Sequence, residues 1–259
     1  MRSHNRTVVI ALCMLVLPAM LRAQEDNEPV INPEAMDALR KMGEYLRTLQ
    51  KFQITGVVTN DQVLPDSQKI QITKYVDLVA SRPNRLRVLV KADQYERQLI
   101  FDGTTFTLFA PRKNMYSTIS APGTINDLAT LIEEKHAIEL PLVDMFRWGT
   151  SEEQRAEITA AKDVGESVCD GVTCHHYAFR QPGLDWEVWI QEGDHPLPRK
   201  VVLTTRTDEA RPQHTATYTW NLAPSFSEES FAFVPPKDAQ KITLADLTAA
   251  KTAAKGGQD

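Results

Sequence analysis

The sequence predicts an α+β protein that is mainly β, with one antiparallel sheet, an N-terminal helix and a helical insertion. Three observations lead to this fold class. Apolar residues recur at helical spacing over 33–51, and from Phe52 the period changes to two. The strand pattern then returns in segments of about ten residues separated by short turns, as in antiparallel meanders. It is interrupted only at 124–149, where the helical period reappears.

The first 23 residues are typical of a secretory signal peptide. Arg2 and Arg6 precede the apolar run TVVIALCMLVLPAML, and the small residue Ala23 closes the segment. We expect cleavage near Ala23 and export of the remainder; an uncleaved membrane anchor is the alternative. Lipid attachment at Cys13 is disfavoured, because Leu12 stands where such sites have a small residue.

Cleavage would change the charge balance. The full chain has 29 basic and 34 acidic side chains, a net charge of −5 at pH 7. Three arginines and no acidic residue lie in the leader, so the exported chain carries about −8. Such a chain repels phosphate backbones, and the sequence has no basic stretch with interleaved aromatic residues. We therefore expect no nucleic-acid partner.

The first helix is expected from Asn32 to about Lys51, after a flexible segment at 24–31. Asn32 suits the N-cap and Pro33 the first helical position. The apolar stripe of this helix consists of Met36, Leu39, Met42, Leu46 and Leu49. Its polar face mixes both charges, which favours packing on a core over binding to a membrane surface.

Strands are expected on both sides of the insertion. Before it they are predicted at 52–60, 68–81, 84–93, 96–103, 104–111 and 114–120, and after it at 158–168, in three strands within 168–206, and over 214–225 and 227–242. Alternation places Lys74 on the same face as Val76, Leu78 and Ala80. Neither half has enough strands to close a core, so we expect one domain over 32–247 and a disordered tail at 248–259.

The insertion predicts two short helices rich in large apolar residues. Thr124 or Asn126 can cap the first, and Pro141 starts the second, which Gly149 ends. Inserted helices of this kind often cover the open face of a curved sheet.

The segment CDGVTC predicts a hairpin with a four-residue loop. Such a loop would place Cys169 and Cys174 opposite each other, within reach of a disulfide. Free thiols are the alternative. A redox-active pair is disfavoured, because such cysteines are usually separated by two residues and lie at the start of a helix.

No compact catalytic or metal motif is recognised. His175 and His176 point to opposite faces of a strand, and His195 lies in a turn, which disfavours a zinc site. Asp185 and Glu187 share a strand face, as paired catalytic carboxylates would, but a solvated strand edge is the simpler interpretation. Nucleotide-binding glycine loops and the nucleophile elbow are absent from the sequence. We expect no metal, no cofactor and no catalytic residue.

Four phrases, DGTTFTLFAP, DWEVWI, PLPRKVVL and FAFVPP, carry a resemblance to a known family. Over about residues 33–244 the chain resembles the predicted periplasmic proteins called domain of unknown function 2092. It is more distantly similar to the bacterial lipoprotein-carrier and lipoprotein-localisation (LolA/LolB-like) superfamily. This resemblance implies a periplasmic location and a strongly curved, unclosed half-barrel, with the helices covering an apolar cavity on its concave face.

The resemblance further implies a non-enzymatic protein that binds a lipid or a lipoprotein acyl chain in that cavity. One alternative is an envelope module that binds a protein partner and fills the cavity with its own side chains; a hydrolase is a third hypothesis. The residues expected to line the concave face and bind the ligand are Leu99, Phe101, Phe106, Leu108, Phe146 and Trp186.

Overall fold

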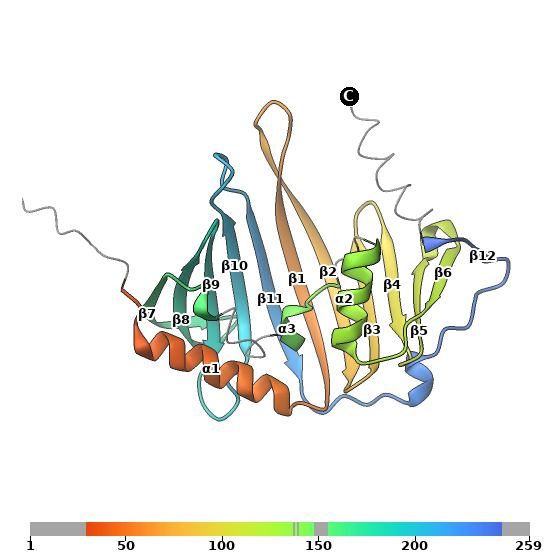
Figure 1. Cartoon of the computed structure of the whole chain (residues 1–259), viewed down its shortest axis with the longest axis horizontal. Coiled ribbons are helices and arrows are strands. Elements are labelled where there is room, and N and C mark those ends of the chain that lie inside the picture. The colour runs from red at the N-terminus through yellow and green to blue at the C-terminus, as the bar shows by residue number, and fades with distance from the viewer. Residues whose placement is uncertain (1–29, 137, 139, 148–154, 245–259) are drawn as a thin grey trace, which may run out of the picture.

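The computed structural model describes residues 30–136, 138, 140–147 and 155–244. Its main feature is one sheet of 12 strands in the order β12-β6-β5-β4-β3-β2-β1-β11-β10-β9-β8-β7 (Figure 1). The strands are β1 (Lys51–Val63), β2 (Lys69–Ser81), β3 (Arg85–Ala92), β4 (Glu96–Phe101), β5 (Thr105–Ala110), β6 (Met115–Ser120), β7 (Ala160–Cys169), β8 (Val172–Gln181), β9 (Leu184–Gln191), β10 (Pro198–Thr205), β11 (Gln213–Asn221) and β12 (Gln240–Lys241). Neighbouring strands are antiparallel, except that β12 pairs parallel with β6.

The chain builds this sheet as two meanders that meet at β1. The first runs outward from β1 to β6, and the second starts at the opposite edge with β7 and returns to β1 through β11. The join is in register, with Gly56 opposite Tyr218 and Val58 opposite Ala216. Because β6 and β7 lie near opposite edges, the segment between them has to cross the sheet.

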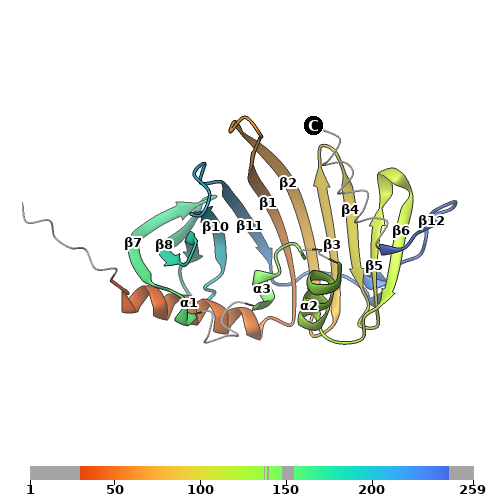
Figure 2. The same ribbon diagram turned by 45° about the horizontal axis from the view of Figure 1, so that its top comes forward.

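That crossing explains where the helices lie. The helices are α1 (Pro33–Thr48), α2 (Ile125–His136) and α3 (Asp144–Arg147), with short 3-10 turns at Pro111–Lys113 and Glu228–Phe231. These three α-helices, whose bounds the structure describes, lie on the concave face of the curved sheet (Figures 1 and 2). α1 runs along the lower ends of the β7–β11 half. We call α2, α3 and the described residues between them the helical cover.

Local chemistry accounts for α1. The Asn32 side chain accepts a hydrogen bond from the backbone of Ala35 at 2.8 Å, and proline follows the cap. On the solvent face, Arg40 pairs with Asp37 and Glu44, both at 2.6 Å. The buried stripe consists of Ala35, Leu39, Met42, Gly43 and Leu46. The expected amphipathic helix therefore packs its apolar face on the sheet, and it ends at Thr48, where an extended residue begins the approach to β1.

The core lies between the concave face and the helices. Alternate residues of the strands point into it, as Phe52, Ile54 and Val58 do in β1. The largest fully buried side chains include Phe101, Phe106, Phe146, Leu128 and Ile132. This arrangement confirms the predicted fold class of a mainly β, strongly curved and unclosed sheet. None of the described helices is long and apolar enough to cross a membrane.

The two ends of the chain are only partly described. The expected leader at 1–23 and the tail at 248–259 lie outside the described residues. The segment expected to be flexible at 24–31 is described from Val30, whose carbonyl accepts a hydrogen bond from Ala161 of β7 at 3.2 Å. The strand expected over 227–242 is reduced to the two residues of β12, because Pro235 and Pro236 remove backbone donors.

Candidate functional site

A cavity of about 530 Å³ lies between the sheet and the helical cover. Ligand pockets commonly have volumes of about 300–1,000 Å³. Strands β1 to β5, β10 and β11 all contribute to its walls, together with Glu133, Ile138, residues 140–143 and Arg147. The cavity is therefore built by both meanders and closed by the segment that crosses between them.

The floor of the cavity is apolar because the strands place every second side chain on the concave face. Its apolar members are Val58, Val76, Val90, Leu99, Leu108, Ala110, Leu203 and Tyr218. Cross-strand pairing brings them together: Leu99 lies opposite Leu108, and Gly56 lies between Val76 and Tyr218. A Cβ atom on Gly56 would lie 3.2 Å from the Thr217 carbonyl oxygen. Because glycine has no side chain, no atoms protrude from this part of the floor.

The cover contributes an irregular apolar stretch between its two helices. Ile138, Leu140, Pro141, Leu142 and Val143 line the cavity from above. Leu142 has a φ of 59°, a left-handed conformation that is unfavourable for a bulky residue. Its Cδ1 atom would lie 3.9 Å from a Cβ atom on Gly56, so this side chain reaches down toward the central strand.

Two interactions hold the cover in place. Arg147 of α3 donates to Glu133 of α2 at 3.0 Å, which links the two helices. Arg82, at the end of β2, donates to the carbonyl of Met145 at 3.4 Å and lies over the Phe146 ring at 5.0 Å. Burial lowers the pKa of Arg82 from its ordinary value. The guanidinium thus joins the sheet to α3.

Polar side chains gather at one end of the cavity. Lys74 of β2 and Arg97 of β4 line it, as do Asn60 and His214, which are hydrogen-bonded to each other across β1 and β11. These residues lie toward the end of the sheet that carries the β1–β2 and β3–β4 turns, at the top of Figure 1, whereas α1 lies at the other end. The cavity therefore has an apolar floor and one polar end.

The six residues expected to bind a ligand occupy different places. Leu99 and Leu108 line the cavity. Phe101, Phe106 and Phe146 are about 1% exposed and belong to the packed core. Trp186 stacks on Phe179 at 4.2 Å in the other half of the sheet; it lies opposite Leu203, which lines the cavity, but does not line the cavity itself.

The predicted disulfide is wrong. β7 ends at Cys169 and β8 begins at Val172, so the loop has two residues, Asp170 and Gly171, with φ of 49° and 77°. Cys169 therefore lies opposite Val172 rather than Cys174. The two cysteines are diagonal neighbours, a relation that separates Cα atoms by about 7–8 Å and does not suit a disulfide. Both thiols are free and buried.

The candidate metal ligands are dispersed over separate contacts. His175 contacts Asp163 at 2.6 Å, and His176 contacts Glu187 at 2.8 Å, from opposite faces of β8. His195 is hydrogen-bonded to Tyr45 of α1. Among the residues that the structure describes, no group of three or more His, Cys, Asp or Glu side chains could hold a metal ion.

The two carboxylates considered for acid–base chemistry have separate partners. Asp185 accepts hydrogen bonds from Arg180 at 2.6 Å and Arg211 at 3.1 Å, and these contacts, led by Arg180, lower its pKa. Glu187 is bonded to His176 instead. Asp185 thus belongs to ion pairs with arginines, and Glu187 to a separate hydrogen bond with His176.

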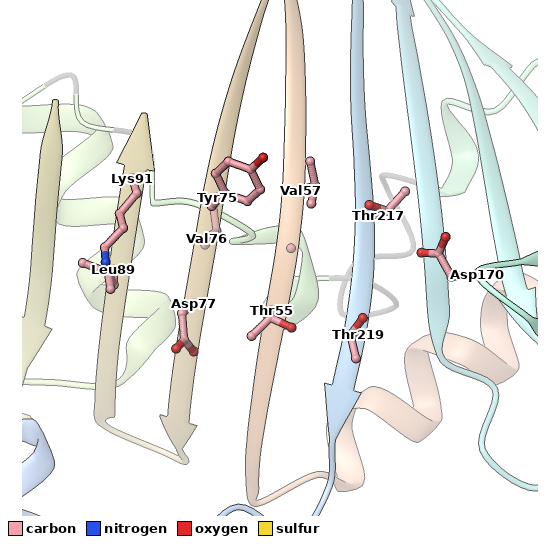
Figure 3. A pocket seen from close by; sticks show the side chains of 11 residues that line it. Thr55, Val57, Tyr75, Val76, Asp77, Leu89, Lys91, Asp170, Thr217 and Thr219 are labelled. Carbon is pink, nitrogen blue, oxygen red and sulfur yellow. The ribbon is translucent and has the colours of Figure 1, made fainter. Parts of the chain in front are cut away.

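The convex face carries a shallower groove of about 450 Å³ (Figure 3). Its side chains point away from the helices and come from the alternate positions of the central strands, including Thr55, Val57, Tyr75, Thr217 and Thr219. Hydroxyl groups are prominent in its lining. The concave cavity is the better candidate site, because it combines an apolar floor with a cover.

A family model described as "Predicted periplasmic protein (DUF2092)" matches residues 35–245. The chain belongs to this family. The match confirms the family recognised from the sequence and, through the family's description, the expected periplasmic location. No curated protein matches the sequence.

Solved structures with a related fold have low sequence identity to this chain. The lipoprotein LppX of Mycobacterium tuberculosis is 14% identical, with 75% of this chain and 98% of that one covered and a TM-score of 0.45. An uncharacterised conserved protein from Thermus thermophilus is 13% identical over 81% and 99% of the two chains, with a TM-score of 0.46. A LolA superfamily protein of Nitrosomonas europaea is 10% identical over 77% and 97%, with a TM-score of 0.34.

Proposed function

We propose that this protein binds a hydrophobic ligand, such as a lipid or an acyl chain, in the cavity between the sheet and the helical cover. The observation that carries the proposal is the cavity itself. About 530 Å³ stays open above an apolar floor, even though large side chains fill the core around it. Burial of apolar surface would supply most of the affinity, at about 25 cal/mol per Å².

The open cavity weighs against the alternative of a partner-binding module whose interior is filled by its own side chains. Such a module needs no space beneath α2 and α3. A cavity lined by apolar residues from seven different strands, by contrast, is the form expected of a carrier or a sensor of hydrophobic molecules.

The direct test uses protein purified from a periplasm. Native mass spectrometry should show a co-purifying lipid, and the delipidated protein should take up the uncharged fluorescent probe N-phenyl-1-naphthylamine. Val90→Phe places a larger side chain in the cavity and should weaken probe binding at least about tenfold. Val57→Phe, the same change on the convex face, is the matched control and should leave binding unchanged.

Thermal unfolding of both variants separates a blocked cavity from a misfolded protein. A Val90→Phe protein that melts cooperatively and has lost the probe supports the proposal. Absence of lipid and of probe uptake in the wild-type protein would refute it.

A further inference from the structure

The cavity holds more positive than negative charge, in a protein whose total charge is negative. Its lining includes three cationic side chains, Lys74, Arg97 and Arg147, against one carboxylate, Glu133. Glu133 is already paired with Arg147 at 3.0 Å. The chain as a whole has a net charge of −5. Two positive charges are therefore concentrated on the apolar concave face without a carboxylate to balance them.

Lys74 and Arg97 lie where the strand pattern calls for apolar residues. Lys74 is in phase with Val76 on β2, and Arg97 is in phase with Leu99 on β4. Register places Lys74 opposite Val58 and Ala92, and Arg97 opposite Val90. Both are partly buried. Keeping a partly buried cation among apolar neighbours costs free energy unless something pairs with it.

Within the described part of the chain, neither side chain has an ion-pair partner. Arg97 lies 4.8 Å above the ring of Tyr95, which is a cation–π contact and leaves its donors available. Some other cations of the sheet do have such a partner: Arg180 binds Asp185 at 2.6 Å, and Lys69 binds Asp61 at 3.0 Å. An anion bound in the cavity would give Lys74 and Arg97 the partner that the protein does not supply.

The convex groove shows that this charge is particular to the cavity. That groove has Lys91 as its one cation, and two carboxylates, Asp77 and Asp170, face it (Figure 3). A simple surface excess of lysine and arginine would have affected both faces. The uncompensated cations occur instead at the polar end of the covered cavity.

We infer that the ligand is an amphiphile with an anionic head group. This inference rests on the proposed function of the cavity. The apolar tail lies on the floor beneath the cover, and the head group lies at the polar end of the cavity, beside Lys74 and Arg97. A small anion would leave the floor without a partner, and a neutral lipid would leave the two cations without one. A carboxylate or a phosphate head group satisfies the same chemistry.

The test compares ligands that share one tail and differ in the head group. Dodecanoate, dodecyl phosphate and dodecanol compete with N-phenyl-1-naphthylamine, which has no charge and therefore reports the cavity alone. The wild-type protein should bind at least one of the two anionic ligands about tenfold or more tighter than dodecanol. The better of the two identifies the head group. Added salt should reduce the preference.

Two variants with equal change of charge complete the design. In Lys74→Gln/Arg97→Gln the preference for the anionic ligand over dodecanol should fall to nearly one. The variant Lys91→Gln/Lys162→Gln changes exposed positions away from the cavity, and it should keep the wild-type preference for the anionic ligand over dodecanol. Equal binding of all three ligands by the wild type, or a preference that survives in the first variant, overturns the inference while probe uptake still supports a hydrophobic site. Failure of the wild type to take up the probe overturns both.

Discussion

The two ends of the concave face are covered in different ways. α1 lays 16 helical residues along the β7–β11 half, with an unbroken buried stripe. The helical cover brings only a 12-residue helix and a four-residue helix, joined by an irregular stretch. α1 packs its buried stripe on the sheet and leaves an open groove of about 780 Å³ along β8 and β9, whereas the helical cover leaves the covered cavity of about 530 Å³. A regular amphipathic helix packs closely on a curved sheet, whereas the described part of the segment between β6 and β7 borders a cavity.

The contacts that attach the two regions to the rest of the molecule differ as well. α1 is tied to β7 by Asn32, whose backbone N–H donates to the Ala161 carbonyl at 2.9 Å, and to the β9–β10 loop by Tyr45, whose hydroxyl lies 2.7 Å from Nδ1 of His195. The cover depends on Arg82, which contacts α3, and on the turn between β4 and β5, which binds the residues that lead into α2. Both regions are stabilised by packing, since Leu128, Ile132 and Phe146 of the cover are buried as well, and the polar contacts position the cover over the cavity.

The largest expected effect tests whether α1 carries more stability than the cover. Leu46 of α1 is 2% exposed, so Leu46→Ala should lower the free energy of unfolding by about 2–5 kcal/mol. Leu142 borders an existing cavity and is only partly buried, so Leu142→Ala should cost less than about 1 kcal/mol. Urea unfolding of both variants measures the two values. Equal costs would contradict this difference between α1 and the residues that border the cavity.

A smaller effect concerns the anchor of the cover. Asp102 lies in the β4–β5 turn; burial would raise the pKa of its carboxyl, but hydrogen bonds from Thr105 and Thr104 outweigh that and hold the pKa at about 2. The same turn accepts backbone bonds from Ala121 and Gly123, just before α2. Because the pKa is lower in the folded protein than the ordinary value of 3.8, the stability it brings is present above that value and is lost as the pH falls toward 2.

The measurement compares wild type with Asp102→Asn, which keeps the shape of the side chain and does not ionise. Wild type should be the more stable at pH 5, and the difference should shrink by about 1 kcal/mol by pH 2, a value reduced for solvent screening. Hydrogen exchange should locate the loss in α2. A difference that does not change with pH would show that the turn does not depend on the ionised carboxylate.

Strand identity and strand faces were predictable from the sequence, because the period of two directly encodes which side chains share a face. Which residues of a strand line the cavity and which belong to the packed core was not predictable. Leu99 and Phe101 share a face of β4, yet Leu99 lines the cavity and Phe101 belongs to the filled core. That distinction depends on where the cover crosses, which follows from the pairing of β1 with β11 far away in the sequence.

Some features were encoded in the sequence and were missed there. Lys74 is in phase with Val76 on a strand whose buried face is otherwise apolar, which is the signal for a cation in the cavity. In the cysteine hairpin, Asp170-Gly171 is itself a favoured two-residue turn, and the β-branched Val172 and Thr173 belong to a strand. A two-residue turn at Asp170-Gly171 places Cys169 opposite Val172, so the two cysteines are not cross-strand partners.

The smallest expected effect follows from that hairpin. Cys169 and Cys174 lie in the half beneath α1, where strand pairing and side-chain contacts such as that of His175 with Asp163 hold β7 to β8 without a disulfide. Dithiothreitol should leave the melting temperature of the periplasmic protein unchanged, since no covalent link closes the loop. Burial first, and then the neighbouring Cys169, raise the pKa of the Cys174 thiol to about 11, so it should not react with Ellman's reagent at pH 8 until urea unfolds the chain. A reductant-sensitive melting temperature would mean that the cysteines are bridged after all. In that case covalent closure, as well as packing, would distinguish the half beneath α1 from the half beneath the helical cover.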